Sequence, residues 1–347
     1  MPIPTQCTAE GGVSDASAAL DAVTRAEKTA RVRVRLLAWF ATNRRDLPWR
    51  QTRDPYRILV SEVMLQQTQV DRVVSYYNRF LERFPTVVDL AAAPTADVIR
   101  AWAGLGYNRR AVNLQRTAQS VVDDHGGEFP RSVDALRALP GIGAYTAGAV
   151  ACFAFEQDVG FIDTNIRRVI HRLFAGVDVP TLQRSERELA ALAARLVPPN
   201  RGWEWNQGVI EFGALQCTAR RPACVVCPLQ ADCLAYPAIQ TAIAELPRGT
   251  RTAQKREAPF AGSNRYYRGQ ILARLRDAGE SAAGGGIPLH TLGPLVREGF
   301  SDADVPWLYG VVQGLAKDGL AKVAEAPPSY DPSEPLETTG EVRVELP

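Results

Sequence analysis

The sequence feature that most constrains this chain is a group of four cysteines within seventeen residues. Their spacing is Cys217-x6-Cys224-x2-Cys227-x5-Cys233. A [4Fe–4S] cluster needs one thiolate for each iron, so this group predicts one such cluster. A zinc site usually shows two separated Cys-x2-Cys pairs, and this group has only one, which leaves zinc as the weaker alternative. With every iron bound by cysteine, we expect a structural or positioning role for the cluster rather than Lewis-acid catalysis.

The N-terminal segment and the overall hydropathy predict neither export nor membrane insertion. Residues 1–29 mix Pro, Thr, Ser, Gly and Ala without the basic start and apolar block of a signal peptide, so we expect a disordered tail. No run of about 18 apolar residues is long enough to span a membrane. We therefore expect a cytoplasmic, bacterial-type protein with no membrane partner, in which clustered cysteines favour metal over disulfides. The net charge of +2 does not decide whether nucleic acid is a partner.

Apolar periodicity predicts an all-helical domain over residues 30–245. Residues 31–43 place their apolar side chains on one helical face. Asp54-Pro55 is typical of a helix start, with an N-cap followed by proline in the first turn. No alternating strand pattern occurs before residue 260. Further helices are expected at 71–83, 95–103, 108–124, 132–138, 144–154, 164–174, 183–196 and 203–216.

The C-terminal part predicts a second, smaller domain. Residues 246–262 are rich in Pro, Arg, Lys and Gly and are predicted to be a linker. Residues 263–347 then show three helical segments followed by two short apolar runs. These segments are 264–278, 289–298, 303–318, 320–323 and 342–346. Three helices followed by a two-stranded ribbon outline a winged helix, so we expect a winged-helix-like α+β domain.

A short turn with two glycines separates two of the predicted helices. Its sequence is Leu139-Pro140-Gly141-Ile142-Gly143. Such a turn exposes backbone N–H groups beside the N-terminus of the next helix, which can accept a phosphate without reading sequence. Gly141 and Gly143 are therefore candidate DNA-binding residues. An ordinary turn between helices is the alternative.

Two carboxylates are predicted to lie in opposite environments. Glu62 stands between Val60 and Val63 in an apolar helix, where desolvation raises the pKa of a glutamate and favours its protonated form. Asp163 stands at the N-terminus of a predicted helix, where a carboxylate should stay ionised. Breaking a glycosidic bond needs this pair, an acid for the leaving group and an anion for the positive sugar. A surface position for Glu62 and a purely capping role for Asp163 are the alternatives.

Together these residues resemble the helix-hairpin-helix DNA glycosylases with an iron–sulfur loop, and more closely the adenine DNA glycosylases of the MutY type. The resemblance covers residues 31–237. It implies an all-α helix-hairpin-helix DNA glycosylase fold, with a six-helix barrel, an iron–sulfur helical half and an active site in the cleft between them. The motifs that carry it are Leu47-Pro48-Trp49-Arg50, Ser61-Glu62-Val63-Met64-Leu65-Gln66-Gln67-Thr68-Gln69-Val70, Gly104-Leu105-Gly106-Tyr107, the glycine turn and the cysteine loop.

The resemblance also implies roles for individual catalytic residues. Glu62 would protonate the adenine ring and then handle the attacking water. Asp163 would stabilise the oxocarbenium-like sugar, and Asn165 would help to orient it. Tyr145 stands where bifunctional relatives of the endonuclease III type carry a catalytic lysine. Without that amine no Schiff base with the sugar can form, which implies a monofunctional glycosylase.

The same resemblance implies which residues contact the flipped base and the DNA stack. The residues that would line the base pocket are Trp49, Arg50 and Gln207. Those that would wedge into the stack as the adenine is flipped are Gln66, Gln67 and Tyr107. For each of them, core packing or a solvated surface position is the alternative. The implied substrate is double-stranded DNA with adenine mispaired with 8-oxoguanine or guanine, bound by a monomer that associates with the nucleoid.

The C-terminus departs from the family pattern. MutY-type enzymes usually carry a β-rich, Nudix-like domain that reads 8-oxoguanine, whereas residues 263–347 predict a winged helix. The chain thus resembles a short form that lacks the Nudix-like domain. Its C-terminal domain would contact DNA, contact a protein partner, or only pack on the catalytic core. The arginines available for DNA contact are Arg265, Arg268, Arg274 and Arg276.

Two other functions stay open on sequence alone. A mismatch thymine or uracil DNA glycosylase would share the scaffold, but some of those enzymes lack a glutamate at the position of Glu62. A non-catalytic DNA-binding protein would need neither Glu62 nor Asp163. The presence of both carboxylates therefore favours the adenine glycosylase.

Overall fold

The computed structural model describes residues 12–246, 260–281, 286–324 and 342–347. It divides into two compact units. The cluster unit comprises Met1–Asp46 and Ala151–Thr252, and the hairpin unit comprises Leu47–Val150 and Ala253–Pro347. The predicted linker at 246–262 lies largely outside the described residues, and its boundaries stay a prediction. Among the described helices, none combines the length and the apolar character that crossing a bilayer requires.

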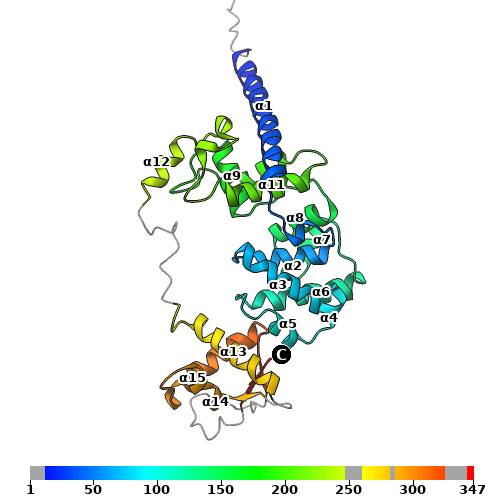
Figure 1. Cartoon of the computed structure of the whole chain (residues 1–347), viewed down its shortest axis with the longest axis vertical. Helices are drawn as coiled ribbons and strands as arrows, with labels where there is room; N and C mark the ends of the chain where they lie inside the picture. Colours follow the sequence, from blue (N-terminus) through cyan, green and yellow to red (C-terminus); the bar gives the residue numbers. More distant parts are fainter. Residues whose placement is uncertain (1–11, 247–259, 282–285, 325–341) are drawn as a thin grey trace, which may run out of the picture. The chain divides into compact units, whose positions relative to one another are not determined.

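The cluster unit is a set of packed helices around α11 (Gly202–Leu215). Helix α1 (Gly12–Asn43) and helix α9 (Thr164–Phe174) both pack on α11 (Figure 1). The remaining helices of this unit are α10 (Glu186–Leu196), α12 (Ala238–Ala244) and the short turns η2 (Cys224–Val226) and η3 (Gln230–Asp232). The start of α1 at Gly12 corrects the expected start at residue 31, since the helix reaches back into the predicted tail. Residues 1–11 lie outside the described part.

A buried ion pair ties the end of α1 to α11. Glu211 is fully buried, and Arg45 donates to both of its carboxylate oxygens, from Nε at 2.9 Å and from Nη2 at 2.8 Å. The backbone amide of Arg45 adds a third bond to Glu211 Oε1 at 2.8 Å. A buried carboxylate is tolerated in a core only when its lone pairs are met in this way.

The hairpin unit begins with a chain of short helices. They are η1 (Pro48–Arg50), α2 (Pro55–Leu65), α3 (Val70–Arg83), α4 (Val87–Ala92), α5 (Thr95–Ala101), α6 (Arg109–His125), α7 (Val133–Ala138) and α8 (Ala144–Phe155), whose last residues belong to the cluster unit. The predicted cap of α2 is confirmed, because the Asp54 carboxylate accepts from the amides of Tyr56 at 2.8 Å and Arg57 at 3.5 Å. Helix α4 was not predicted. It is held at its start by a capping box of Thr86 and Asp89.

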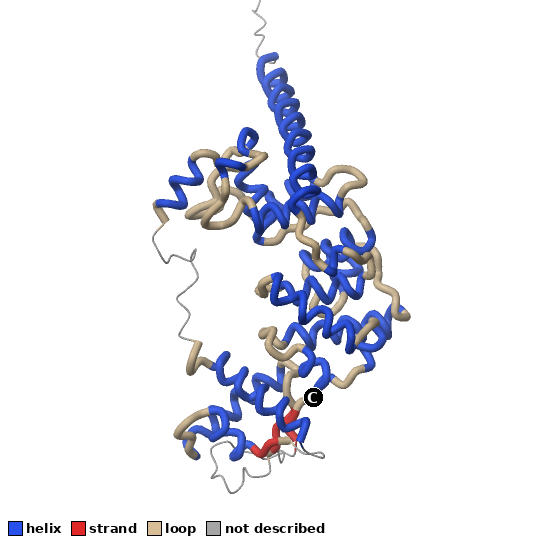
Figure 2. The backbone as a smooth tube through the Cα atoms, in the orientation of Figure 1, coloured by secondary structure: helices blue, strands red, loops and turns tan. Residues whose placement is uncertain are grey.

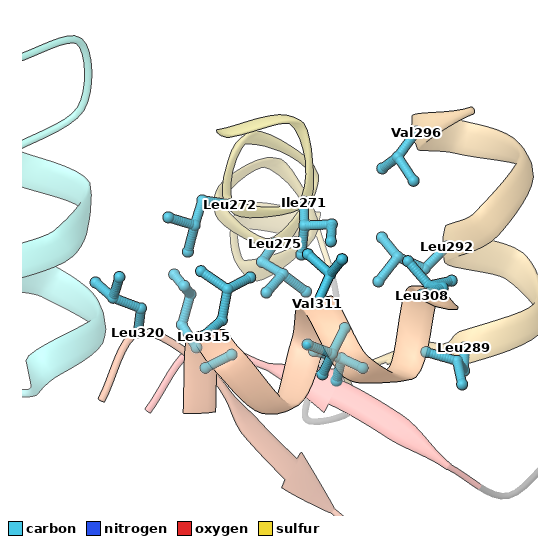
Figure 3. Packing of buried hydrophobic residues seen from close by; sticks show 14 of the residues in the cluster. Ile271, Leu272, Leu275, Leu289, Leu292, Val296, Leu308, Val311, Leu315 and Leu320 are labelled. Carbon is cyan, nitrogen blue, oxygen red and sulfur yellow. The ribbon is translucent and has the colours of Figure 1, made fainter. Parts of the chain in front are cut away.

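The C-terminal domain confirms the three helices and the ribbon expected from the sequence. Its elements are α13 (Asn264–Ser281), β1 (Ile287–Pro288), α14 (Leu289–Val296), η4 (Asp302–Asp304), α15 (Val305–Lys317), β2 (Lys322–Ala324) and β3 (Arg343–Glu345). The sheet order is β1-β3-β2, antiparallel throughout, with Val344 paired to Ile287 on one side and Val323 on the other. The strands are drawn in red in Figure 2. Strand β1 was not predicted, because two residues are too few to show an alternating pattern, and it makes the predicted two-stranded ribbon a three-stranded sheet. The helices enclose an apolar core that includes Leu272, Leu308 and Leu315 (Figure 3).

Candidate active site and cysteine loop

The four cysteines line one pocket of the cluster unit. They follow α11 and are brought together by the turns η2 and η3. Apolar and aromatic side chains complete the wall, among them Leu173, Phe212, Tyr236 and Ile239. The four cysteines in this wall are Cys217, Cys224, Cys227 and Cys233, all half-buried free thiols. The sequence prediction that these cysteines act together is thus confirmed.

The donor set fits a cluster better than a single ion. Burial raises the pKa of Cys227 to about 11 and also raises the pKa of Cys217, where nearby Arg172 opposes the shift. Bound cations are what would hold such buried thiols as thiolates. Four thiols spread around a pocket suit four irons, one thiolate for each.

Arg172, on α9, fixes the start of the cysteine loop. Only 2% of its surface is exposed. Its Nε donates to Asp178 Oδ1 at 2.7 Å, its Nη1 to the carbonyl of Thr218 at 2.8 Å and its Nη2 to the carbonyl of Ala219 at 3.1 Å. Its Nη1 also lies 3.6 Å from Cys217 Sγ. One buried guanidinium therefore holds the backbone that follows the first cysteine.

Asp163 is the N-cap of α9, as predicted, and it begins a chain of hydrogen bonds. Its Oδ1 accepts from the amide of Ile166 at 2.6 Å, and its Oδ2 accepts from Asn165 Nδ2 at 2.9 Å. Asn165 Oδ1 accepts from Arg168 Nη2 at 2.7 Å. Arg168 Nε then donates to the carbonyl of Cys217 at 2.7 Å. Both oxygens of Asp163 are oriented, and the chain runs without a gap from this carboxylate to the cysteine loop.

Replacing Arg168 with leucine is expected to slow base excision by about 10- to 100-fold and to reduce the iron content, because Arg168 holds both Asn165 and the carbonyl of Cys217. Leucine fills similar space but releases Asn165, so the second oxygen of Asp163 loses its oriented donor. Single-turnover excision and iron analysis of the purified chain measure both effects. Arg167→Leu is the matched control, because Arg167 pairs with the exposed Glu186 at 2.7 Å. An Arg168→Leu chain with full excision would rule out an orienting role.

Glu62 is buried on α2 in the hairpin unit. Its side chain and backbone together are 5% exposed, so the alternative of a surface position is wrong. Its neighbours Val60, Ser61 and Val63 are buried as well. Asp163 belongs to the other unit, the cluster unit. Burial of Glu62 provides the desolvation that the sequence prediction requires.

Two of the predicted wedge residues have a left-handed backbone. Gln67 has φ of 57° and Tyr107 has φ of 47°, and both side chains are exposed, Tyr107 by 54%. Gly104 and Gly106, beside Tyr107, also have positive φ, of 91° and 75°. A Cβ atom at Gly104 would collide with the Tyr76 hydroxyl, which only glycine avoids. Non-glycine residues in this region cost free energy and are concentrated at functional sites.

Arg110, in the first turn of α6, holds both strained segments. Its Nη1 donates to three carbonyls at the end of α2, those of Val63 at 2.8 Å, Met64 at 3.0 Å and Gln66 at 2.6 Å. Its Nη2 donates to the carbonyl of Gly106 at 3.2 Å. The guanidinium also lies 5.5 Å from the ring centre of Tyr107, within cation–π range. The helix that carries Glu62 is thus joined to both wedge segments by one side chain.

Arg110→Ala is expected to slow excision by about 10²-fold, because both wedge segments and the end of α2 lose a common anchor. Arg110→Lys should recover only part of this rate, since one ammonium group cannot reach carbonyls on both segments. Single-turnover excision, with circular dichroism to confirm the fold, is the measurement. Arg79→Ala serves as control because Arg79 is an exposed arginine on α3. Equal rates for the Arg110 and Arg79 variants would contradict the anchoring role.

The glycine turn between α7 and α8 has the predicted tight geometry. Gly141 has φ of +78°, and a Cβ atom there would lie 2.9 Å from Asn113 Cβ. Thr117 Oγ1 donates to the carbonyl of Pro140 at 2.6 Å, which fixes the turn against α6. Gly141 and Gly143 are exposed beside the first turn of α8, where helix amides have no partner within the helix. Phosphate binding at this turn stays a prediction.

The other predicted site residues are found in varied environments. Trp49 is buried, with its ring edge-on to Tyr77 at 5.5 Å, so it packs in the core of the hairpin unit. Gln207 is buried on α11 in the cluster unit. Arg50 is half-buried in η1, and Tyr145 is half-buried in the first turn of α8. Their contacts with a base or sugar stay predictions.

The sequence did not single out Arg110, Arg168 or Arg172. A weak signal exists for the last two, because residues four apart on a helix share a face and both lie on the helix that Asp163 begins. That spacing places both guanidinium groups on the face of α9 that meets the cysteine loop, where Arg168 donates to the carbonyl of Cys217 and Arg172 to that of Thr218. Arg110 offers no comparable signal, since its partners lie on another helix.

Comparisons with known proteins agree with this geometry. Residues 60–195 match the HhH-GPD superfamily of base excision DNA repair proteins, and residues 217–233 match the iron–sulfur binding domain of endonuclease III. The chain is thus a helix-hairpin-helix glycosylase-fold protein with a [4Fe–4S]-binding domain. An adenine DNA glycosylase of Mycolicibacterium smegmatis is 44% identical over 247 residues, which covers 71% of this chain and 80% of that protein. The chain belongs to the adenine DNA glycosylase family.

Other relatives match smaller parts. The adenine DNA glycosylase of Mus musculus is 44% identical over 218 residues, and the match spans 60% of this chain but 42% of that protein. A thermostable thymine-DNA glycosylase has a TM-score of 0.57 and 33% identity, covering 62% of this chain and 98% of that chain. An endonuclease III bound non-covalently to DNA has a TM-score of 0.51 and 26% identity, and the match covers 60% of this chain and 93% of that chain. The matched region is therefore the glycosylase core.

Proposed function

We propose that this chain removes adenine mispaired with 8-oxoguanine or guanine from double-stranded DNA by hydrolysing the N-glycosidic bond. The observation that carries the proposal is the burial of Glu62 in a chain 44% identical to an adenine DNA glycosylase. Burial favours a protonated carboxyl group, which is what a general acid for a nucleobase leaving group must be.

Glu62 protonates the adenine ring, which weakens the bond between base and sugar. Asp163 stabilises the positive charge that develops on the sugar, with Asn165 holding one carboxylate oxygen at 2.9 Å. Glu62, now ionised, then takes a proton from the attacking water. The proton balance is closed, because the acid that donates in the first step accepts in the second.

Tyr145 makes the reaction monofunctional. A lyase step would need an amine to form a Schiff base with the sugar, and a phenol cannot supply one. Excision should therefore leave an abasic site with an intact strand. Borohydride should trap no covalent complex between the chain and its substrate.

The remaining residues bind and open the duplex. Tyr107, Gln66 and Gln67 enter the stack where adenine leaves it, and the strained backbone of Tyr107 and Gln67 supports this role. The turn with Gly141 and Gly143 binds a phosphate of the same duplex. Trp49 and Arg50 of the hairpin unit and Gln207 of the cluster unit are each proposed to contact the flipped base. The chain acts as a monomer in the cytoplasm, at the nucleoid.

A panel of four duplexes tests the proposal, containing A·8-oxoguanine, A·G, T·G or U·G, each analysed with and without alkali. Cleavage of the two adenine duplexes only after alkali is the expected result. Cleavage of T·G or U·G alone would instead favour a mismatch thymine or uracil glycosylase, a candidate supported by the 33% identity to a thymine-DNA glycosylase. Strand cleavage without alkali would contradict the monofunctional assignment, and no excision at all would favour a non-catalytic DNA-binding protein.

A further inference from the structure

The C-terminal domain shares a core with α5 and α6. Ile99 and Val112 belong to the same buried cluster as the apolar side chains of this domain, part of which is drawn in Figure 3. The amide of Ala96 donates to the carbonyl of Pro347 at 2.9 Å. A Cβ atom at Gly319 would lie 3.3 Å from Val112 Cγ1, so the turn after α15 approaches α6 closely. The domain is thus continuous with the core of the hairpin unit.

Polar contacts from the same domain fall at the start of α6. Arg276 Nη2 donates to Asn108 Oδ1 at 2.9 Å, and Arg109 Nη1 lies 3.5 Å from Asp318 Oδ1. Asn108 directly follows Tyr107, whose φ is 47°. A backbone in this region persists only where its surroundings hold it there. The C-terminal domain therefore supplies contacts one residue away from the wedge tyrosine.

The third helix of this domain is poorly suited to reading DNA. In helix-turn-helix proteins the recognition helix lies in the major groove, and phosphate binding requires Lys and Arg side chains. Helix α15 contains a single Lys or Arg residue, Lys317, and the turn before it carries Asp302 and Asp304. Its other exposed positions include Gly310 and Gln313. Its charge favours neither groove entry nor phosphate contact.

Of the four arginines of α13, two make contacts inside the protein, whereas Arg265 and Arg274 are exposed. Arg276 is engaged by Asn108, and Arg268 donates to Asp318 at 2.5 Å. Arg274, two residues before Arg276, is exposed. Two of the arginines that the sequence offered for DNA contact are therefore used inside the protein, while a neighbour on the same helix is not buried.

We propose that the C-terminal domain braces the loop Gly104–Asn108, with Arg276 as a positioning residue that acts on Tyr107 through Asn108. The inference rests on the wedge role given to Tyr107 under the proposed function. By fixing the residue that follows Tyr107, Arg276 keeps the strained backbone in place when the ring enters the stack. The domain thus contributes to base flipping without touching DNA.

The test uses the full chain and a duplex with 2-aminopurine in place of adenine, whose fluorescence rises when the base leaves the stack. Arg276→Ala, Asn108→Ala and the double variant are compared with Arg274→Ala. Arg276→Ala and Asn108→Ala should each reduce the flipping equilibrium by about tenfold, because a charged hydrogen bond is lost. The double variant should be no worse than either single variant. Arg276→Lys, which keeps the charge and one donor, should restore part of the flipping, and Arg274→Ala should match the wild type.

The variants distinguish the bracing role of Arg276, the wedge role of Tyr107 and phosphate contact by the C-terminal domain. If Tyr107→Ala impairs flipping but folded Arg276→Ala flips the base as well as the wild type does, the bracing role of Arg276 is wrong and the wedge role of Tyr107 stands. Full flipping by Tyr107→Ala would overturn the wedge role and the brace together. Weaker DNA binding by Arg274→Ala, with the slope of log affinity against log salt reduced by about one, would show that the domain contacts phosphate instead.

Discussion

Glu62→Gln is expected to lower the single-turnover rate of adenine excision by about 10²- to 10⁴-fold, with little change in affinity for the mismatched duplex. Glutamine keeps the size and the hydrogen-bonding capacity of the side chain but cannot donate a proton to the leaving base. The effect should therefore fall on the chemical step and not on binding. Quenched-flow excision and a filter-binding titration with A·8-oxoguanine DNA separate the two.

The control for Glu62→Gln is a second buried glutamate, Glu211, which is held by Arg45. Glu211→Gln removes a buried charge from a structural ion pair, so it should lower the unfolding temperature. Glu62→Gln should leave the unfolding temperature within a few degrees of the wild type. An excision rate for Glu62→Gln close to that of the wild type would exclude general acid catalysis by this residue.

Features that depend on a few neighbouring residues could be predicted from the sequence. The caps formed by Asp54 and Asp163 lie directly before the helices they begin, so residue type and position were sufficient. The cysteine loop could also be predicted, because its four cysteines lie close together in the sequence. Helices of six or seven residues show too little of a 3.6-residue period to be predicted reliably, so α4 and α12 were missed although α7 and α5, of the same lengths, were predicted.

Contacts between distant segments could not be predicted in this way. Arg110 reaches a carbonyl 47 residues away, and Arg172 lies beside a thiol 45 residues away. Nothing in the local sequence of an arginine shows which carbonyls it will meet after folding. The same limit explains the arginines of α13, which looked available for DNA and instead include Arg276, bound to Asn108 across 168 residues.

Arg172→Met is expected to reduce the iron content of the purified chain and to lower the free energy of unfolding by about 3–5 kcal/mol, since it breaks a buried ion pair. Methionine leaves Asp178 without its partner and frees the carbonyls of Thr218 and Ala219, which hold the loop after Cys217. Both effects act on the same segment, so cluster binding and folding should fail together. Iron analysis, the visible absorbance of the cluster and thermal unfolding are the measurements.

The comparison with Asp178→Asn separates the ion pair from the loop contacts. This substitution would weaken the pair with Arg172 but leave the bonds from Arg172 to Thr218 and Ala219 in place, so iron should be largely retained. The iron content of Arg172→Lys should lie between those of the wild type and Arg172→Met, because one ammonium group cannot satisfy the carboxylate and both carbonyls. If Arg172→Met and Asp178→Asn lost iron equally, the ion pair alone would account for the effect. Full iron in Arg172→Met would show that the four cysteines bind the cluster without this support.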